Sequence, residues 1–392
     1  MRRYGAVTPL ALARDARRRC FLTTIETQHC PHNPFPKEGR LHMPFFYRRA
    51  LGVAAVAAAA GAGPLAAQQP AQAPQVTVGG LVYTQFVYQL KDTLSHVNNF
   101  DITRAYVNVL GKFSGGVGTR LTADIYRNTD GSLAYRLKYA FATYTPTGSP
   151  VTYKLGLLHT PWLDWEEALW DYRMQGTMPL ERGFMKPDGT QSAYVSASDF
   201  GAGVDGKWGP DKVNFQLTVV NGEYYKAAPG DQGKDVMGRV SVRVSDTDDS
   251  SRVGGLRVTA YAQYGKPTGG GERDRYLAMV SYRTKQITLA GEAAATQDRA
   301  IGAVGVNGRV YSAFGVYKFP NTKAAVLARV DVADQQAGVA DRQTRLIGGV
   351  SYQLSPNWRL LGDWDYVSFQ GTPNPAQEAV RSQALFQTQF TF

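Results

Sequence analysis

Cysteine and histidine are scarce in this sequence of 392 residues. Both cysteines, Cys20 and Cys30, lie within the first 42 residues, and beyond residue 67 the histidines are His96 and His159. From residue 68 onward these numbers exclude a disulfide scaffold and a metal centre built from thiolates or imidazoles. The spacing of Cys20 and Cys30 relative to the nearby histidines matches no usual zinc pattern. We therefore expect neither a metal nor a cofactor.

Long apolar runs are also missing beyond residue 67. No stretch of about eighteen apolar residues occurs there, which excludes a membrane-spanning helix. Helical periodicity is rare, whereas Tyr, Gly, Thr, Val and Gln are abundant. This composition predicts an all-β chain.

The first 75 residues differ from the rest. Residues 1–42 are basic and irregular, and we expect them to be an N-terminal extension from a start codon placed too early. Residues 43–67 carry Arg48 and Arg49, an Ala-rich apolar run and small residues up to Ala67, which predicts a cleaved signal peptide for export. A buried Ala-rich helix is the alternative. Residues 68–75 form a Gln, Pro and Ala linker, and residues 76–392 are expected to form one domain.

The basic net charge is mostly a property of the N-terminal part. The whole chain has 43 Lys+Arg against 32 Asp+Glu, for +11; ten of these basic and three of these acidic residues precede residue 68. The remainder has 33 against 29, or +4. A basic pI is therefore no argument for a nucleic-acid partner.

Segments in which apolar and polar residues alternate recur along residues 76–392. Their even number, and lengths of about ten residues or more, predict a 16-stranded antiparallel transmembrane β-barrel. Connections after even-numbered strands are mostly short turns and those after odd-numbered strands are longer, as expected for two different rims. The predicted strands are Val76–Leu90, Phe100–Phe113, Val117–Asn128, Leu133–Thr145, Val151–Thr160, Asp199–Trp208, Lys212–Asn221, Asp235–Ser245, Gly255–Gly265, Arg273–Thr284, Gln286–Gln297, Gly308–Phe319, Ala324–Ala333, Gln343–Leu354, Trp358–Phe369 and Val380–Phe392.

Positive charge shares one face of these strands. In Asp235–Ser245, for example, Val236, Val240 and Val242 alternate with Arg239 and Arg243. In a soluble sandwich the apolar face would be the core, and in a membrane barrel it faces lipid while the arginines line a water-filled lumen. The export signal favours the barrel. The predicted channel-lining residues are Arg104, Arg120, Arg136, Lys138, Lys154, Arg239, Arg243, Arg257, Arg275, Arg283, Arg329 and Arg345. Aspartates on the same face are Asp124, Asp205, Asp331, Asp363 and Asp365.

The last strand, which ends at Phe392, resembles the closing strand of bacterial outer-membrane barrels. Ala384, Phe386, Thr388 and Phe390 share its apolar face. The resemblance implies that the barrel-assembly machinery reads this strand, and that the protein is in contact with outer-membrane lipid.

The connection after the fifth strand is the longest, and in general porins the loop at that position folds inward and narrows the channel. We expect the same here. The predicted constriction residues are Trp162, Asp164, Trp165, Glu166, Glu167, Asp171, Arg173, Glu181, Arg182 and Lys186. Trp162, Trp165 and Trp170 are expected to pack the loop against the wall, with a sugar-stacking platform as the alternative.

Several segments resemble the phosphate-selective porin O/P family in order along the chain. They are Phe100–Val109, Tyr153–Trp162, Met178–Arg182, Ser198–Val204, Asn221–Glu223 and Lys234–Val240. The resemblance implies a homotrimeric outer-membrane channel for small anions. Lysines cluster at the constriction of phosphate-specific members, whereas residues 161–189 here carry six acidic and three basic residues. The channel is therefore expected, and phosphate selectivity is not.

These observations predict a porin for passive diffusion of small hydrophilic solutes with a mild preference for anions, and not an enzyme. One alternative is an outer-membrane hydrolase that uses the loop carboxylates Glu166, Glu167 and Asp171. A non-selective or purely structural barrel is the other.

Overall fold

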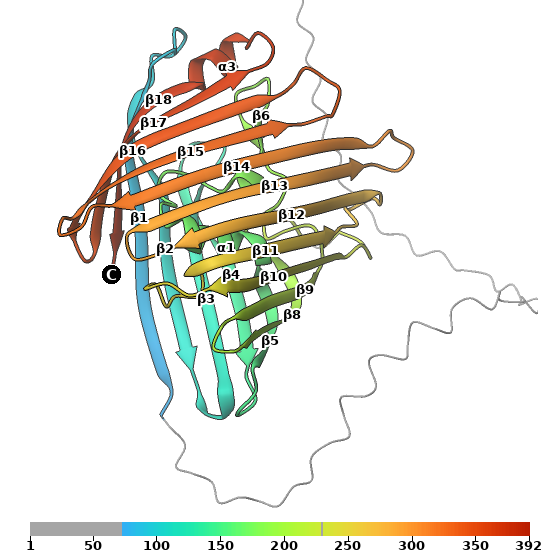
Figure 1. Ribbon diagram of the computed structural model, residues 1–392. Coiled ribbons are helices and arrows are strands. Elements are labelled where there is room, and N and C mark those ends of the chain that lie inside the picture. The colour runs from blue at the N-terminus through green and yellow to red at the C-terminus, as the bar shows by residue number, and fades with distance from the viewer. Residues whose placement is uncertain (1–72, 229) are drawn as a thin grey trace, which may run out of the picture. The chain divides into compact units, whose positions relative to one another are not determined.

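The computed structural model describes residues 73–228 and 230–392, which form a closed antiparallel barrel of sixteen strands (Figure 1). The expectations for residues 1–42, the signal peptide 43–67 and residues 68–72 of the linker lie outside the described residues. The barrel strands are β1 (Gln75–Gln89), β2 (Asn98–Lys112), β3 (Val117–Arg127), β4 (Leu133–Tyr144), β5 (Val151–His159), β8 (Ser198–Trp208), β9 (Val213–Val220), β10 (Asp235–Ser245), β11 (Gly255–Tyr264), β12 (Glu272–Arg283), β13 (Ile287–Arg299), β14 (Val306–Lys318), β15 (Ala324–Asp334), β16 (Gln343–Ser355), β17 (Trp358–Phe369) and β18 (Ser382–Thr391).

The predicted strands all occur, and the predicted 16-stranded barrel is confirmed. The largest difference is at the last connection, where α3 (Pro375–Val380) precedes β18. Asn374 caps this helix because its side chain accepts from the Gln377 backbone amide while the Gln377 side chain accepts from the Asn374 amide. The short helix was not predicted.

The barrel closes between β1 and β18, as the sequence of the last strand predicts. Phe86 lies opposite Phe386, and the Thr84 and Thr388 hydroxyl oxygens are 2.8 Å apart. The Gly80 amide donates to the carbonyl of Phe392 at 2.9 Å. With both β1 and β18 paired on each side, the sheet has no free edge.

The two faces of the wall agree with the alternation in the sequence. On β10 the side chains of Val236, Val240 and Val242 are exposed on the outer face, whereas Arg239 and Ser241 are buried on the inner face. The outer surface is therefore apolar, and polar side chains face inward. Among the described residues, no helix is long and apolar enough to cross a membrane.

A bulge in β4 reverses the expected orientation of two aromatic residues. Thr122 pairs with Tyr139 and Ala123 with Leu137, so Lys138 has no partner of its own in β3. The extra residue shifts the alternation by one. Tyr139, which strict alternation places outside with Tyr135, is 5% exposed, and its ring centroid is 3.9 Å from that of His159. Strict alternation from Tyr135 predicts that Tyr139 and Phe141 face outward, and this prediction is wrong because the bulge turns both inward, where Phe141 contacts His159.

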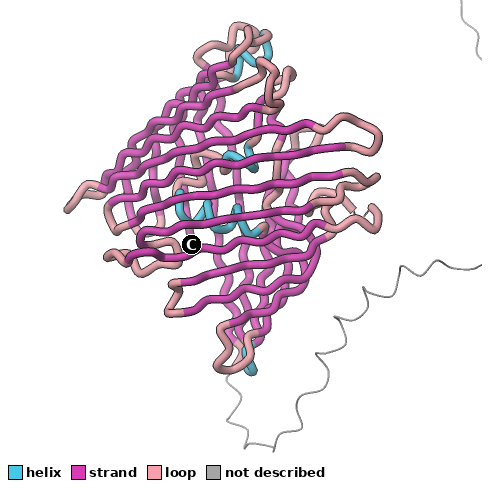
Figure 2. Tube along the Cα trace, turned by 45° about the vertical axis from the view of Figure 1, so that its right-hand side comes forward, coloured by secondary structure: helices cyan, strands magenta, loops and turns pink. Residues whose placement is uncertain are grey.

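The connection between β5 and β8, residues 160–197, is a folded element and not a plain loop. It contains α1 (Pro161–Trp170), α2 (Pro179–Arg182) and the two-residue strands β6 (Phe184–Met185) and β7 (Gln191–Ser192). α1 begins with a proline at its first position and ends at Asp171, which adopts left-handed backbone angles. We call residues 160–197 the inner segment, because Figures 1 and 2 both show its helical turns within the ring of strands.

Candidate functional site: the inner segment and the charged wall

α1 packs onto the inner wall through its tryptophans. Trp162, Trp165 and Trp170 are fully buried. The Trp162 ring lies 6.0 Å from that of Tyr261 on β11, and the Trp170 ring 5.0 Å from that of Phe314 on β14. The expectation that the tryptophans pack the segment against the wall is confirmed. Such complete burial leaves none of the three rings open as a sugar-stacking platform.

The wall beneath the inner segment is apolar at many inward positions. This was not predicted, because charged residues were the signal that identified the inner face. Side chains of this wall and of the segment form one buried core. The buried apolar residues contributed by β10 to β17 are Met237, Tyr261, Leu277, Met279, Ala290, Ala294, Val310, Phe314, Val316, Ala325, Leu327, Ile347 and Leu361.

Arg329 on β15 joins α1 to the wall electrostatically. Its guanidinium donates to Glu166 at 2.6 Å and to Asp331 at 2.8 Å, and all three side chains are nearly excluded from solvent. Glu166 also accepts from the Trp162 indole at 2.9 Å. A buried cation with two carboxylates is satisfied only while both stay in place. Arg329 was predicted to line the channel, but it holds the inner segment.

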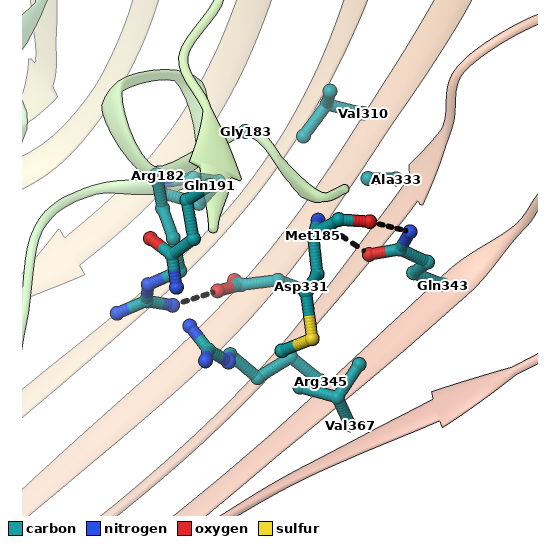
Figure 3. A pocket seen from close by; sticks show the side chains of 11 residues that line it. Arg182, Gly183, Met185, Gln191, Val310, Asp331, Ala333, Gln343, Arg345 and Val367 are labelled. Atoms are coloured by element: carbon teal, nitrogen blue, oxygen red, sulfur yellow. Dashed lines mark hydrogen bonds and ion pairs between the residues drawn. The ribbon is translucent and has the colours of Figure 1, made fainter. Parts of the chain in front are cut away.

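Arg182 makes a second such link, beside a small cavity between the inner segment and β14 to β17 (Figure 3). It donates to Asp331 at 2.8 Å and to Gln175 at 3.2 Å. Gln343 on β16 exchanges two hydrogen bonds with the Met185 backbone, at 2.7 and 2.8 Å. Arg182 and Asp331 are thus paired beside this cavity, and Gln343 fixes β6 to the wall.

Other predicted constriction residues form local pairs. Glu167 and Glu181 share Arg173, at 2.7 and 2.9 Å. Asp171 contacts Arg359 at 3.4 Å and Lys318 at 3.7 Å. These contacts link the ends of the helices to each other and to β14 and β17.

Two more predicted constriction residues lie toward the two ends of the segment. Asp164 pairs with Arg252 at 2.7 Å. Burial raises the pKa of the Asp164 carboxyl, but the neighbouring basic groups, with the Arg252 guanidinium first among them, together outweigh burial, so that this pKa lies below its ordinary value. Lys186 lies half-buried in the β6–β7 turn, where its amide donates to the Thr190 carbonyl at 2.7 Å.

Predicted lining residues on β10 and β11 surround Trp165. The Arg239 guanidinium carbon lies 4.3 Å from the centroid of the indole ring, and that of Arg257 lies 5.4 Å from it. Arg257 also donates to the Asp211 carbonyl at 2.9 Å, and Arg239 to Asn214 at 2.6 Å. Cation–π contact is strongest when the pair is desolvated, as here.

On β12, both predicted lining arginines bind backbone of the inner segment. Arg275 donates to the Tyr194 carbonyl at 3.1 Å and pairs with Asp298 at 2.8 Å. Arg283 donates to the Ala168 carbonyl at 2.8 Å, at the C-terminal end of α1.

The last two predicted lining arginines of this wall pair with nearby carboxylates. Arg345 lies 3.0 Å from Asp365. Arg243 lies 3.4 Å from Asp246.

Strands β2 to β5 carry the remaining predicted lining residues. Arg104 and Lys138 share Asp124, at 2.5 and 3.7 Å, and Lys154 pairs with Asp205. Lys138 is fully buried, and it donates to the Tyr106 hydroxyl at 2.5 Å. Lys138 therefore shares one carboxylate with Arg104, and its ammonium group is covered.

Arg120 and Arg136 differ from the other cations of β2 to β5. Within residues 73–228 and 230–392, neither forms an ion pair. Arg120 lies 3.0 Å from His159 Nε2 and over the Tyr139 ring. Arg136 lies between two tyrosine rings, 4.8 Å from Tyr126 and 4.9 Å from Tyr225. Their positive charge is not balanced by a neighbouring carboxylate.

The loop carboxylates of the hydrolase alternative bind different cations. Glu166 binds Arg329, Glu167 binds Arg173 and Asp171 faces Arg359 and Lys318. These contacts stabilise the segment. In the described part of the chain, no cluster of three or more His, Cys, Asp or Glu side chains is arranged to hold a metal ion.

Comparison with known proteins finds likeness in fold alone. No family model matches the chain, and no curated protein sequence matches it. The anion-selective porin from Comamonas acidovorans superposes with a TM-score of 0.56 at 14% identity, over 81% of this chain and 100% of the porin. The trimer form of OmpT, an outer membrane protein of Vibrio cholerae, gives 0.58 at 11% identity, over 82% and 100%. Salmonella typhi OmpF in complex with daunomycin gives 0.61 at 12% identity, over 81% and 97%. The chain has the porin type of β-barrel fold.

Proposed function

We propose that this protein is an outer-membrane channel through which small hydrophilic solutes diffuse passively, with a modest preference for inorganic anions, phosphate or small organic acids. The observation that carries the proposal is the closed ring of sixteen strands with an apolar outer face and a charged inner face. A barrel of this strand number is wide enough to enclose a water-filled lumen. Export through the signal peptide at 43–67, and assembly through the strand ending at Phe392, belong to the same proposal.

Arg120 and Arg136 support the preference for anions. A guanidinium keeps its charge at every physiological pH, and here no carboxylate within ion-pair distance cancels it among the described residues. One neighbour in fold, described as an anion-selective porin, supports the same preference. Another is described as a trimer. We include a homotrimer in the proposal. The resemblance to the phosphate-selective porin O/P family supports the architecture of the proposed channel. It is not used as an argument for a preference for phosphate.

Planar bilayer recording tests this function. Purified full-length chain, exported and assembled in outer membranes, should insert with stepwise increases in conductance. In a KCl gradient the reversal potential should have the sign of a modest chloride preference. Bilayers that stay closed at all doses would refute the channel. A clear potassium preference would refute the anion preference and leave the channel intact.

A further inference from the structure

A cavity of about 420 Å³ opens at the rim where the connections are short, away from the contacts that hold α2 to the wall. It lies between the β4–β5 and β8–β9 turns, next to inward side chains of β8, β9 and β10. The side chains that matter for its chemistry are Asp205, Gln216 and Arg239, with Lys207 and Arg252 also on its lining.

Polar atoms without partners occur on three neighbouring strands at this cavity. Gln216 on β9 lies directly opposite Asp205 on β8 and directly opposite Arg239 on β10. In the described part of the chain, Arg239 Nε and Nη1, Gln216 Nε2 and Asp205 Oδ1 have no hydrogen-bond partner. Arg239 is 4% exposed and Gln216 3%. Buried donors without partners are costly, and native proteins rarely keep them unless something else satisfies them.

The electrostatic balance at the cavity favours an anion. Arg252 is neutralised by Asp164, and Asp205 is paired with Lys154. Arg239 forms no ion pair within the described residues. The Trp165 ring covers one face of its guanidinium, so the free N–H groups in the guanidinium plane remain available.

We propose that Arg239, Gln216 and Asp205 form a binding site for a small hydroxy-carboxylate at this mouth of the barrel. The carboxylate accepts hydrogen bonds from Arg239 and from the Gln216 amide, and the hydroxyl group donates to Asp205 Oδ1. A ligand with both groups pairs with a free edge of the Arg239 guanidinium, with Gln216 Nε2 and with Asp205 Oδ1. The inference rests on the proposed channel function, and it gives that channel a solute class.

Competition with chloride current tests the site. Single-channel conductance is recorded in KCl while potassium lactate or potassium propionate is added at constant ionic strength. Lactate should reduce the chloride current saturably, with half-maximal reduction at a concentration about fivefold lower than propionate, because propionate lacks the hydroxyl. Equal effects of the two would overturn the role of Asp205. A linear decrease with neither saturating would overturn the site.

Three variants locate the effect. Arg239→Gln should raise the half-maximal lactate concentration by about tenfold or more, because it removes the positive charge that binds the carboxylate. Gln216→Leu should raise this concentration less and leave the reversal potential in KCl unchanged. Lys212→Gln is the matched control, because Lys212 is exposed in the neighbouring β8–β9 turn and does not line the cavity. An equal loss in Lys212→Gln would show a general charge effect and overturn the site.

A binding measurement separates this inference from the proposed function. Isothermal titration of the detergent-solubilised chain with lactate should give saturable heat that Arg239→Gln abolishes and Lys212→Gln retains. Binding without conductance would refute the channel and keep the site. Conductance without saturable lactate binding would keep the channel and refute the site.

Discussion

Two parts of the inner wall differ in how their arginines are balanced. On β10 to β17 the inward positions mix apolar side chains with arginines, and the inner segment lies on them as a second layer. On β2 to β5 the inward side chains are mainly polar, and Arg120 and Arg136 contact tyrosine rings and histidine there instead of carboxylates. The same residue type therefore has two roles in one barrel. On β10 to β17 most arginines attach the segment or pair with a carboxylate, and on β2 to β5 Arg120 and Arg136 leave their charge unbalanced.

The test with the largest expected effect removes most of the inner segment. Replacing residues 162–194 by a short Gly/Ser linker should raise single-channel conductance severalfold, because the segment occupies cross-section beside β10 to β17. Shortening the β15–β16 connection at 336–340 is the control and should leave the conductance close to that of the unaltered chain. Heat-dependent mobility in detergent gels must show that both barrels are folded. Unchanged conductance after removal of the segment would show that it does not restrict the lumen.

Breaking the Arg329 link should have the next largest effect. Arg329→Met leaves Glu166 and Asp331 buried without their shared cation, which costs about 3–5 kcal/mol. The temperature at which the folded band disappears from detergent gels should fall clearly. Glu166→Gln combined with Arg329→Met should recover part of the loss, because one buried charge is gone. A double variant as unstable as the single one would contradict this assignment.

A matched pair of arginines tests whether the unbalanced arginines of β2 to β5 set ion selectivity. Arg136→Gln should lower the chloride preference by a factor of about two to five, since a unit charge near a passing ion contributes about 1 kcal/mol even in water. Arg275→Gln removes the same charge from beneath the inner segment, where the guanidinium donates to the Tyr194 carbonyl and is nearly excluded from solvent. It should lower thermal stability and leave the reversal potential unchanged. Equal shifts in both variants would erase the difference between the two walls.

The fold could be predicted because its signal is repeated sixteen times. In a barrel strand with lipid on one side and polar groups on the other, apolar and polar side chains alternate along the whole strand, as they do in β10. The errors in the predicted strand bounds are therefore confined to the ends of the strands. The alternation failed at Lys138, where one inserted residue turned Tyr139 inward. A bulge depends on pairing with the neighbouring strand, and the β4 sequence alone has no mark of it.

The site could be predicted in part, because side-chain direction follows from alternation but pairing does not. Arg239 and Arg329 were placed on the inner face, where the structure has them. That Arg329 binds Glu166, 163 positions away, and that Trp165 covers Arg239, depend on how the inner segment docks. The one available signal was apolar residues such as Leu277, Phe314 and Leu327 at inward positions, which predict something packed over them. Lining and constriction roles remain predictions for the recordings proposed above.

The smallest effect is expected from a partly exposed ion pair of the inner segment. Arg252 and Asp164 form an ion pair that is partly exposed, and such pairs contribute about 0–1 kcal/mol. Arg252→Ala should therefore lower the thermal midpoint slightly at neutral pH. Because the pKa of the folded Asp164 carboxyl lies below its ordinary value, its stabilising effect is complete above that ordinary value and is lost as the pH falls through the folded pKa. The difference between the unaltered chain and Arg252→Ala should then shrink as the pH falls below the ordinary aspartate range, and high salt should shrink it at neutral pH. A difference that stays constant in acid and in high salt would show that Arg252 stabilises the segment through its backbone contact with Asp164 and not through charge.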